Sequence, residues 1–466
     1  MNNQEAIYDA KQLGTGKVLV LGLQHMFAMF GATVLVPILT GLDVATTLLF
    51  AGLATLFMHL VTKRKVPVFL GSSFAFLGGY STVVAAGEGY GLTQAQALPY
   101  ACVGVACAGL LYLILALVCN AVGPKKVMKF FPPVVTGPII IAIGMILAPT
   151  ALNNCQANWP IALIAIVVVI VCNIWGKGMV KIVPILLGVL ASYVCAIIFD
   201  SATRQSVITS VSEAAWIGLP IKGENTVFSL VGNCDSGLLV SAIITIVPIA
   251  FATMMEHIGD ISAISSTVEK NFIADPGLHR TLIGDGIGTT IAALFGGPAN
   301  TTYGENTGVL ALTKVYDPMV VRLAAVFAII LSFCPKFAAL ITAMPSATIG
   351  GVSLILYGMI SAVGIRNMVE NQTDFQESRN VIIAALIIGL ALGVEFSGYL
   401  GSTISPEVGN LGHGGIGFTI GAVKITFSGL AVASIVGIIL NAILPGKDKN
   451  FGDEPNSKLS GSLGKY

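Results

Sequence analysis

Twelve apolar runs long enough to cross a lipid bilayer follow one another along this chain, and they constrain its fold more than any other feature. A membrane-spanning helix needs about 20 apolar residues. The charged residues make up only 10% of the chain, too few to cover a surface that faces water on all sides. We therefore expect an all-α polytopic membrane protein. The runs lie near residues 18–38, 44–62, 97–121, 132–149, 159–176, 181–199, 236–258, 280–296, 317–333, 347–365, 380–396 and 423–444.

Two further apolar regions are interrupted by Gly, Ser, Thr and Asn. They are 67–86, which contains LGSSFAFLGGY, and 297–313, which contains GPANTTYGENTGVLALT. Counting both gives fourteen spans. With both termini in the cytoplasm, 20 of the 24 Lys and Arg residues then lie on the cytoplasmic side, as the positive-inside rule requires. Omitting either region destroys this alternation.

The polar connection 200–235 divides the chain into two halves of seven spans each. Because seven is odd, the second half enters the membrane from the opposite side, so the halves form inverted repeats, as in many secondary transporters. The interrupted regions are the third and tenth spans. Their spacing agrees, since Phe74 follows His25 by 49 residues and Glu305 follows Glu256 by 49. The ends, 1–17 and 446–466, are expected to be cytoplasmic, and the second to be disordered.

Several function classes are disfavoured by the composition and by the motifs that are missing from the sequence. The formal net charge of +1 does not indicate a nucleic-acid partner. The eight cysteines form no CxxC pair, so neither a metal site nor another cofactor is expected. Cys155 and Cys234 fall on the same predicted outer side, which leaves a disulfide between them open. The sequence contains no HExxH, GxSxG or Walker motif, so an enzyme and an ATP-driven pump are disfavoured.

Carboxyl groups inside the spans are the first candidates for chemistry. Glu256 lies at the end of an apolar run, where an ionisable group costs at least about 2.5 kcal/mol unless it has a partner, a proton or a water-filled cavity. Asp260 lies one helical turn later on the same face. Two carboxylates that face one cavity disfavour double ionisation, so the pair can gain and lose a proton. The alternative for Asp260 is a solvated position at the helix end.

The interrupted regions supply candidate ligand-binding groups. Irregular backbone at membrane depth must be buried in protein or line a cavity, and Glu305 lies in such a stretch, just before a predicted half-helix. Its alternative role is that of a capping carboxylate. In the other region, Phe74 offers a flat apolar face and Ser73 a hydroxyl, which suits a planar ligand with N–H donors. Neither region contains a basic residue, so a neutral ligand is favoured over an anion. His25 and Tyr357 are candidates for supporting the site, with core packing as the alternative.

Five segments resemble the nucleobase–ascorbate transporter family, and the bacterial uracil:proton symporters in particular. The family signature is a variable residue, then N-x-G-x4-T and often a basic residue, and it reads here from Glu305 and Asn306 to Lys314. In having Glu at the first position of this signature, the chain resembles uracil carriers, whereas purine carriers usually have Gln there. The segments are LGLQHMFAMFGATVLVP (21–37), KVPVFLGSSFAF (65–76), DPGLHR (275–280), NTTYGENTGVLALTKVY (300–316) and GGVSLILYGMI (350–360).

The resemblance implies an elevator transporter in a bacterial plasma membrane, in which a core domain moves against a gate domain. The core would comprise 18–121 and 236–333, and the gate 132–199 and 347–444, with homodimerisation through the gate. A short strand in each interrupted span would pair with the other, antiparallel. The protein's partners would be uracil and membrane lipid, with a proton as the coupling ion.

The resemblance also assigns residues. Glu256, Glu305 and the backbone N–H groups of Gly304 and Phe74 would bind uracil, and Tyr303 would line the pocket. The supporting group would include Asn306, Tyr357, His25 and Ser73. One position departs from the best-known uracil carriers, which have His where this chain has Asp260, as purine carriers do. A xanthine or uric acid carrier is therefore the alternative within the family, and an anion exchanger or channel is the alternative from another class.

Overall fold

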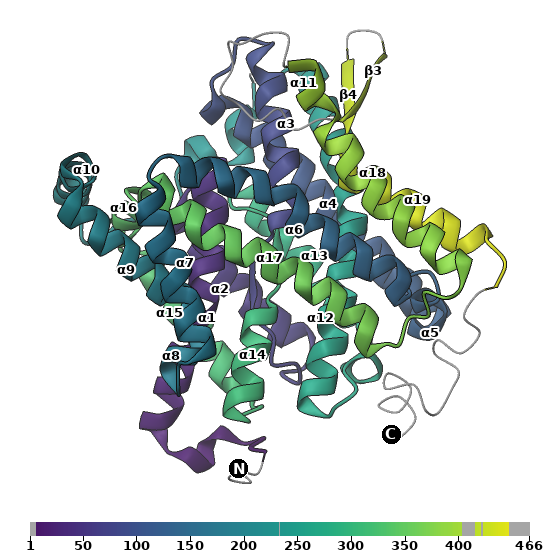
Figure 1. The fold of residues 1–466 in the computed structure, drawn as a ribbon, viewed down its shortest axis with the longest axis horizontal. Coiled ribbons are helices and arrows are strands. Elements are labelled where there is room, and N and C mark those ends of the chain that lie inside the picture. Colours follow the sequence, from purple (N-terminus) through teal and green to yellow (C-terminus); the bar gives the residue numbers. More distant parts are fainter. Residues whose placement is uncertain (1–5, 233, 403–414, 421–422, 447–466) are drawn as a thin grey trace.

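The computed structural model describes residues 6–232, 234–402, 415–420 and 423–446. The helical elements dominate, and the four strands are short (Figure 1). The longer helices are α1 (Thr15–Thr40), α2 (Val44–Val61), α3 (Leu77–Glu88), α4 (Gln94–Val122), α6 (Pro133–Gln156), α7 (Trp159–Ile174), α9 (Pro184–Phe199), α10 (Ser201–Glu213), α11 (Ser236–Ile246), α12 (Ala250–Val268), α13 (Leu278–Leu294), α14 (Gly304–Thr313), α15 (Pro318–Ser332), α17 (Ser346–Glu370), α18 (Ser378–Ser402) and α19 (Gly429–Ile443).

The remaining elements are short and connect these helices. They are the helices η1 (Ala10–Leu13), η2 (Phe74–Phe76), α5 (Pro124–Met128), α8 (Met179–Ile182), η3 (Gly223–Asn225), η4 (Val227–Leu230), η5 (Val247–Ile249), η6 (Ile273–Gly277) and α16 (Pro335–Thr342), and the strands β1 (Leu70–Ser72), β2 (Asn300–Thr302), β3 (Ile416–Ile420) and β4 (Val423–Phe427). β1 pairs with β2, and β3 pairs with β4.

Within the described residues, seven helices are long and apolar enough to cross a membrane, or nine if two bent pairs each count as one span. Their outward faces carry large apolar side chains. On α4, for example, Leu110, Ile114 and Leu117 are 49%, 58% and 67% exposed, and their spacing places them on one stripe. Such stripes are stable only against lipid, so the chain is an integral membrane protein.

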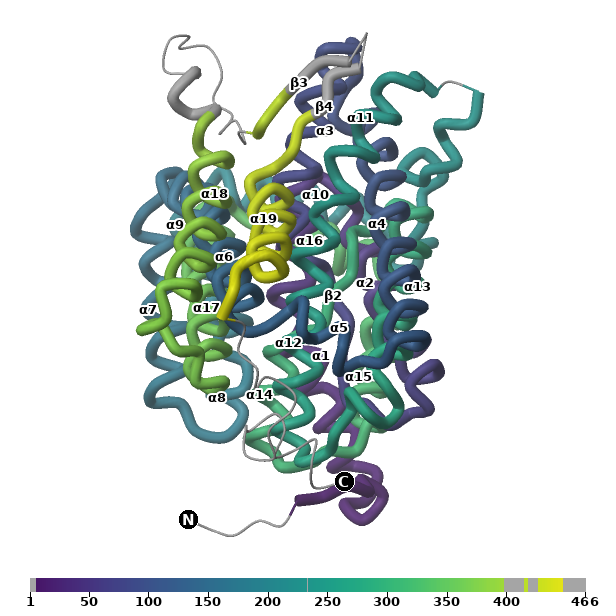
Figure 2. Tube along the Cα trace, turned by 90° about the vertical axis from the view of Figure 1, so that its right-hand side faces the viewer, coloured from purple at the N-terminus to yellow at the C-terminus, as the bar shows by residue number. Residues whose placement is uncertain are grey.

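The helices pack in two groups. In one, α4 packs on α13, α13 on α2, α2 on α15, and α15 on α1. In the other, α17 packs on α6 and α7, α7 on α9, and α18 on α6 and α19. α12 lies between the groups and contacts α6 and α19 on one side and α14 and β2 on the other. The β1–β2 pair lies at mid-height of the molecule (Figure 2).

Two expectations from the sequence differ from the structure, and a disulfide left open is not formed. The run at 423–444 is not one helix, because Val423–Phe427 is a strand and the helix begins at Gly429. The apolar residues Val423, Ile425 and Phe427 alternate there with the polar residues Lys424 and Thr426, a pattern that favours strands. The connection 200–235 is not simply a polar loop, since it contains α10, which turns 107° away from α9. Cys155 and Cys234 are both free thiols, the first buried and the second exposed.

Other expectations fall at the chain ends. The N-terminal segment 1–17 joins the fold at Ile7, whose N–H donates to Lys314 O at 2.9 Å. α1 begins within this segment, at Thr15. The tail 446–466, expected to be disordered, lies almost entirely outside the described residues, which end at 446.

Candidate functional site

The two interrupted regions meet. β1 and β2 pair antiparallel, with Leu70 opposite Thr302 and Ser72 opposite Asn300. Two further backbone bonds extend the ladder, from Tyr303 N to Phe69 O at 3.1 Å and from Ser73 N to Ala299 O at 2.8 Å. Each strand thus supplies the hydrogen bonds that a non-helical segment needs in the absence of water. Helical structure resumes directly after each strand, at Phe74 and at Gly304.

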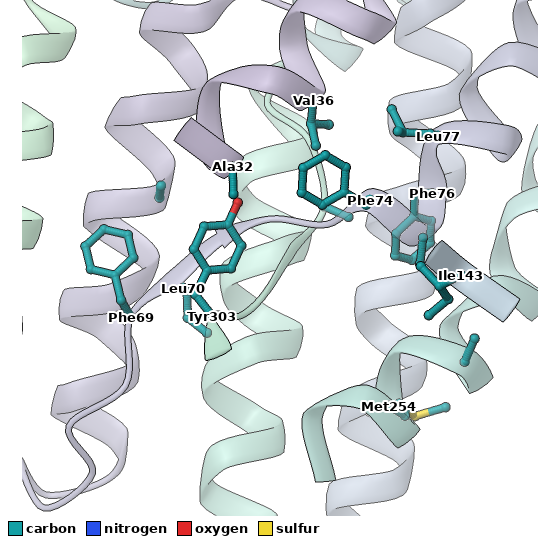
Figure 3. Close-up of a cluster of buried hydrophobic side chains, with 14 of the residues drawn as sticks. Ala32, Val36, Phe69, Leu70, Phe74, Phe76, Leu77, Ile143, Met254 and Tyr303 are labelled. Atoms are coloured by element: carbon teal, nitrogen blue, oxygen red, sulfur yellow. The ribbon is translucent and has the colours of Figure 1, made fainter. Parts of the chain in front are cut away.

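Tyr303 holds β1 in place. Its hydroxyl donates to Ser72 O at 2.9 Å, and Ser72 Oγ donates to Thr33 O on α1 at 2.8 Å. Figure 3 shows the Tyr303 ring beside Leu70, with its hydroxyl toward α1. A Cβ atom on Gly71 would lie 2.4 Å from Tyr303 Cζ, so only glycine fits there. The Tyr303 hydroxyl is therefore used in a hydrogen bond to the β1 backbone, and its ring packs against β1.

Three half-buried carboxyl groups converge beside this strand pair. Glu256 and Asp260 lie one turn apart on α12, and Glu305 is the second residue of α14. α12 packs against both β2 and α14, which places Glu256 and Asp260 close enough to Glu305 to interact electrostatically. Thr302 Oγ1 donates to Asp260 Oδ2 at 2.6 Å, which ties β2 to α12. Because α12 continues two turns beyond Asp260, this residue does not occupy the helix end.

The first turn of α14 offers hydrogen-bond donors. Its N-cap residue, Tyr303, provides no side-chain cap, and Gly304 is exposed, with no atom within 4 Å of the position of a Cβ. The first N–H groups of a helix have no partner within the helix and carry partial positive charge. These N–H groups and the carboxyl oxygens of Glu256 and Glu305 together suit a neutral ligand with both donors and acceptors.

Asn306 and His25 join α14 to α1. Asn306 Nδ2 donates to His25 O at 3.0 Å and lies 3.1 Å from His25 Nδ1, and both side chains are buried. This pair fixes α14 against α1. The role of both residues in supporting ligand binding stays a prediction.

Phe74 and Tyr357 form a contact between the two helix groups. Their ring centroids are 5.6 Å apart at an interplanar angle of 77°, an edge-to-face arrangement. Phe74 is buried next to Val36 of α1 (Figure 3), and Tyr357 comes from α17. Ser73, also fully buried, has no hydrogen-bond partner for its hydroxyl among the described residues.

Asp285 and Glu395 are buried acids that the sequence reasoning missed. Asp285 is on α13, and its Oδ2 lies 2.9 Å from Nδ1 of His257, the residue after Glu256. Glu395, on α18, is 2% exposed and accepts from Gly429 N at 3.1 Å. It lines a cavity of about 10 Å³ shared with Phe74, room for about one water molecule. Both acids interrupt apolar runs, and this interruption is the sequence feature by which they could have been found.

His59 is a further buried histidine. It lies in α2, and its Nε2 is hydrogen-bonded to Val68 O at 2.8 Å.

Comparison with known proteins agrees with this geometry. The model of the Permease family matches residues 16–398. The uracil permease of Bacillus caldolyticus is 38% identical, covering 93% of this chain and 93% of its own length. The uracil permease of Bacillus subtilis (strain 168) is also 38% identical, covering 91% of each chain. Among solved structures, the transmembrane domain of the cyanobacterial bicarbonate transporter BicA shares the fold, with a TM-score of 0.58 at 14% identity, covering 94% of this chain and 99% of that one.

Lipid-facing helices, two helix groups and a polar site at paired broken segments define an integral membrane transporter rather than an enzyme. The chain belongs to the Permease family. The family resemblance read from the sequence is thereby confirmed.

Proposed function

We propose that this protein imports uracil, or a closely related nucleobase, together with a proton. The observation that carries the proposal is the convergence of Glu256, Asp260 and Glu305 on the uncapped first turn of α14. Uracil presents N–H donors and carbonyl acceptors on one planar ring. The carboxyl oxygens would accept from the N–H groups, the α14 N–H groups would donate to a carbonyl, and Phe74 would contact the ring face. The relatives named uracil permease support this choice of ligand.

The proposed mechanism is alternating access. The chain would cross the membrane fourteen times in two inverted repeats, with both termini cytoplasmic and with β1 and β2 inside spans 3 and 10. The spans form two domains, a core (18–121 and 236–333) and a gate (132–199 and 347–444). The separate packing of the two helix groups supports this division. Protonation of the Glu256–Asp260 pair from outside prepares the site for the base, and the core then shifts against the gate. The protein works as a homodimer joined through the gate.

The test is uptake of radiolabelled uracil by proteoliposomes, with and without an inward proton gradient. We expect accumulation only with the gradient, and equal uptake in both would refute proton coupling. Glu305→Gln should weaken uracil binding about 10- to 100-fold, the effect of losing a hydrogen bond to a charged group. Glu377→Gln, at an exposed acid, is the matched control. Unchanged binding by Glu305→Gln would remove Glu305 from the site.

A xanthine or uric acid carrier is the second candidate. The reason is Asp260, because purine carriers also have Asp at this position, whereas the best-known uracil carriers have His. Competition by unlabelled bases separates the two, since xanthine should displace labelled uracil only in a purine carrier. The likeness to a bicarbonate transporter concerns the fold alone, and three carboxyl groups at the site oppose an anionic substrate.

A further inference from the structure

A second cavity lies away from the carboxyl cluster, next to the C-terminal ends of α12 and α14. It is an open groove of about 720 Å³, formed by the loop before β1, the residues after α12 and the residues between α14 and α15. Tyr8 from the N-terminal segment closes one side, and its hydroxyl donates to Val268 O at 3.0 Å. The groove is therefore built from four separate parts of the chain.

The charges that line the groove are unbalanced. Its cations are Arg64, Lys65 and Lys270, and its acids are Asp275 and Asp317. Asp275 pairs with Lys65 at 2.5 Å. Asp317 caps α15, accepting from Met319 N and from Ala10 N, both at 2.8 Å.

Arg64 and Lys270 are thus left, within the described part of the chain, without a carboxylate partner. Lys270 Nζ is held 4.2 Å from the centroid of the Tyr8 ring, a cation–π contact that fixes its position.

Two further observations point to an anionic ligand. Arg64 and the preceding Lys63 both adopt left-handed backbone conformations, with φ of 59° and 55°, which side chains other than Gly, Asn and Asp rarely take. Such conformations cluster at ligand-binding sites. Nearby, Arg322 interacts electrostatically with Asp317 and, less strongly, with Arg64, and its Nη1 is buried with no hydrogen-bond partner among the described residues. Asp317 already accepts from the N–H groups of Met319 and Ala10, so a further anion would reduce the repulsion between Arg64 and Arg322.

We propose that this groove binds a phosphate group, presented either by a soluble phosphate monoester such as a nucleoside monophosphate or by an anionic lipid headgroup. Arg64 would supply a planar pair of N–H donors and Lys270 a point charge, the two usual partners of phosphate. Tyr316 adds a hydroxyl that is a donor at neutral pH, and burial and the nearby Glu269 carboxylate both raise its pKa further. The binding site is separate from the transport site and does not depend on which solute is carried.

The consequence for transport follows from chain connectivity. Arg64 lies a few residues before β1, Lys270 follows the helix that carries Glu256, and Tyr316 follows the helix that carries Glu305. A phosphate that bridges these segments would restrain the elements of the transport site from one end.

The experiment uses the full-length protein in nanodiscs of neutral lipid, at constant chloride so that bulk screening is fixed. Inorganic phosphate and uridine monophosphate are titrated by calorimetry, and the melting temperature is compared with that in discs containing phosphatidylglycerol. The variants are Arg64→Gln with Lys270→Gln, and Lys177→Gln as a control at an exposed cation elsewhere.

We expect saturable binding of at least one probe, weakened roughly tenfold or more by the double variant and unchanged in the control. Binding of phosphate or uridine monophosphate identifies a soluble ligand. A rise in melting temperature that occurs only with phosphatidylglycerol, and is lost in the double variant, identifies a lipid. Equal affinity in the wild type and the double variant, or no response to any probe, overturns the proposal. Unchanged uracil binding by the double variant shows that it is folded.

Discussion

Asp285 Oδ2 lies 2.9 Å from His257 Nδ1, and neither side chain has any surface exposed to solvent. The Tyr112 ring packs against the His257 ring in an edge-to-face arrangement, with ring centroids 6.3 Å apart. His257 is the residue after Glu256, so its side chain leaves α12 about 100° around the helix from Glu256 and fixes that neighbouring face against α13. A buried acid and base in contact are expensive to separate, since each loses its only compensation.

Replacing Asp285 by Ala should therefore lower the free energy of unfolding by about 3–5 kcal/mol. The physical reason is the unpaired polar group left at His257. Thermal unfolding in detergent measures the effect, and Glu88→Gln, at an exposed acid of α3, is the control. A melting temperature equal to that of the control would show that the pair contributes nothing to stability.

Gly71→Ala should destabilise the β1–β2 crossing, because the added methyl would lie 2.4 Å from Tyr303 Cζ. Overpacking of this kind costs about 1–3 kcal/mol, and the shifted strand should also reduce uracil uptake. Gly358→Ala on α17, where nothing lies within 4 Å of the new atom, is the matched control. Wild-type uptake and melting temperature in Gly71→Ala would contradict the tight approach of the strands.

Thr302→Val should slow uracil uptake by about tenfold or more, because it removes the hydrogen bond of 2.6 Å to Asp260 while keeping the side-chain shape. Thr302→Ser keeps the hydroxyl and should restore most of the rate. Initial rates in proteoliposomes measure both. Wild-type rates in the valine variant would mean that the bond has no part in transport.

The Phe74–Tyr357 contact should be measurable as a coupling energy. Leucine replacements at each position and at both give a double-mutant cycle, and edge-to-face ring pairs contribute about 0.5–1.5 kcal/mol. Unfolding is the readout. A coupling energy of zero would show that the rings do not interact in the dominant state.

The sequence predicted the class and the two broken segments well, because both follow from local composition. Most long apolar runs form helices, and dense clusters of Gly, Ser, Thr and Asn favour a break, whereas the isolated glycines of α13 and α17 stay helical. The convergence of Glu256 with Glu305 was expected on weaker grounds, from spacing and family resemblance. The structure brings the two residues together beside the strand pair.

The other contacts between distant segments could not be predicted. Nothing local to Asp285 or His257 indicates that α13 packs against α12 at that level. The commitment of the Tyr303 hydroxyl to Ser72 depends on the register of β1 with β2, which the sequence alone leaves open. The hairpin of β3 and β4 was missed for a different reason: the apolarity of 423–427 was taken as part of a span, although its alternation is typical of a strand.

The pairing of β1 with β2 has a consequence for the biogenesis of this protein. During synthesis β1 leaves the ribosome long before β2 exists, so its backbone groups cannot yet form the ladder that joins Leu70 to Thr302. Unpaired N–H and C=O groups are not tolerated in hydrocarbon. The half-made chain must therefore keep this segment in water or against the insertion machinery until the second half arrives. The transport site is assembled last, and a chain truncated before Asn300 can insert many helices yet cannot form it.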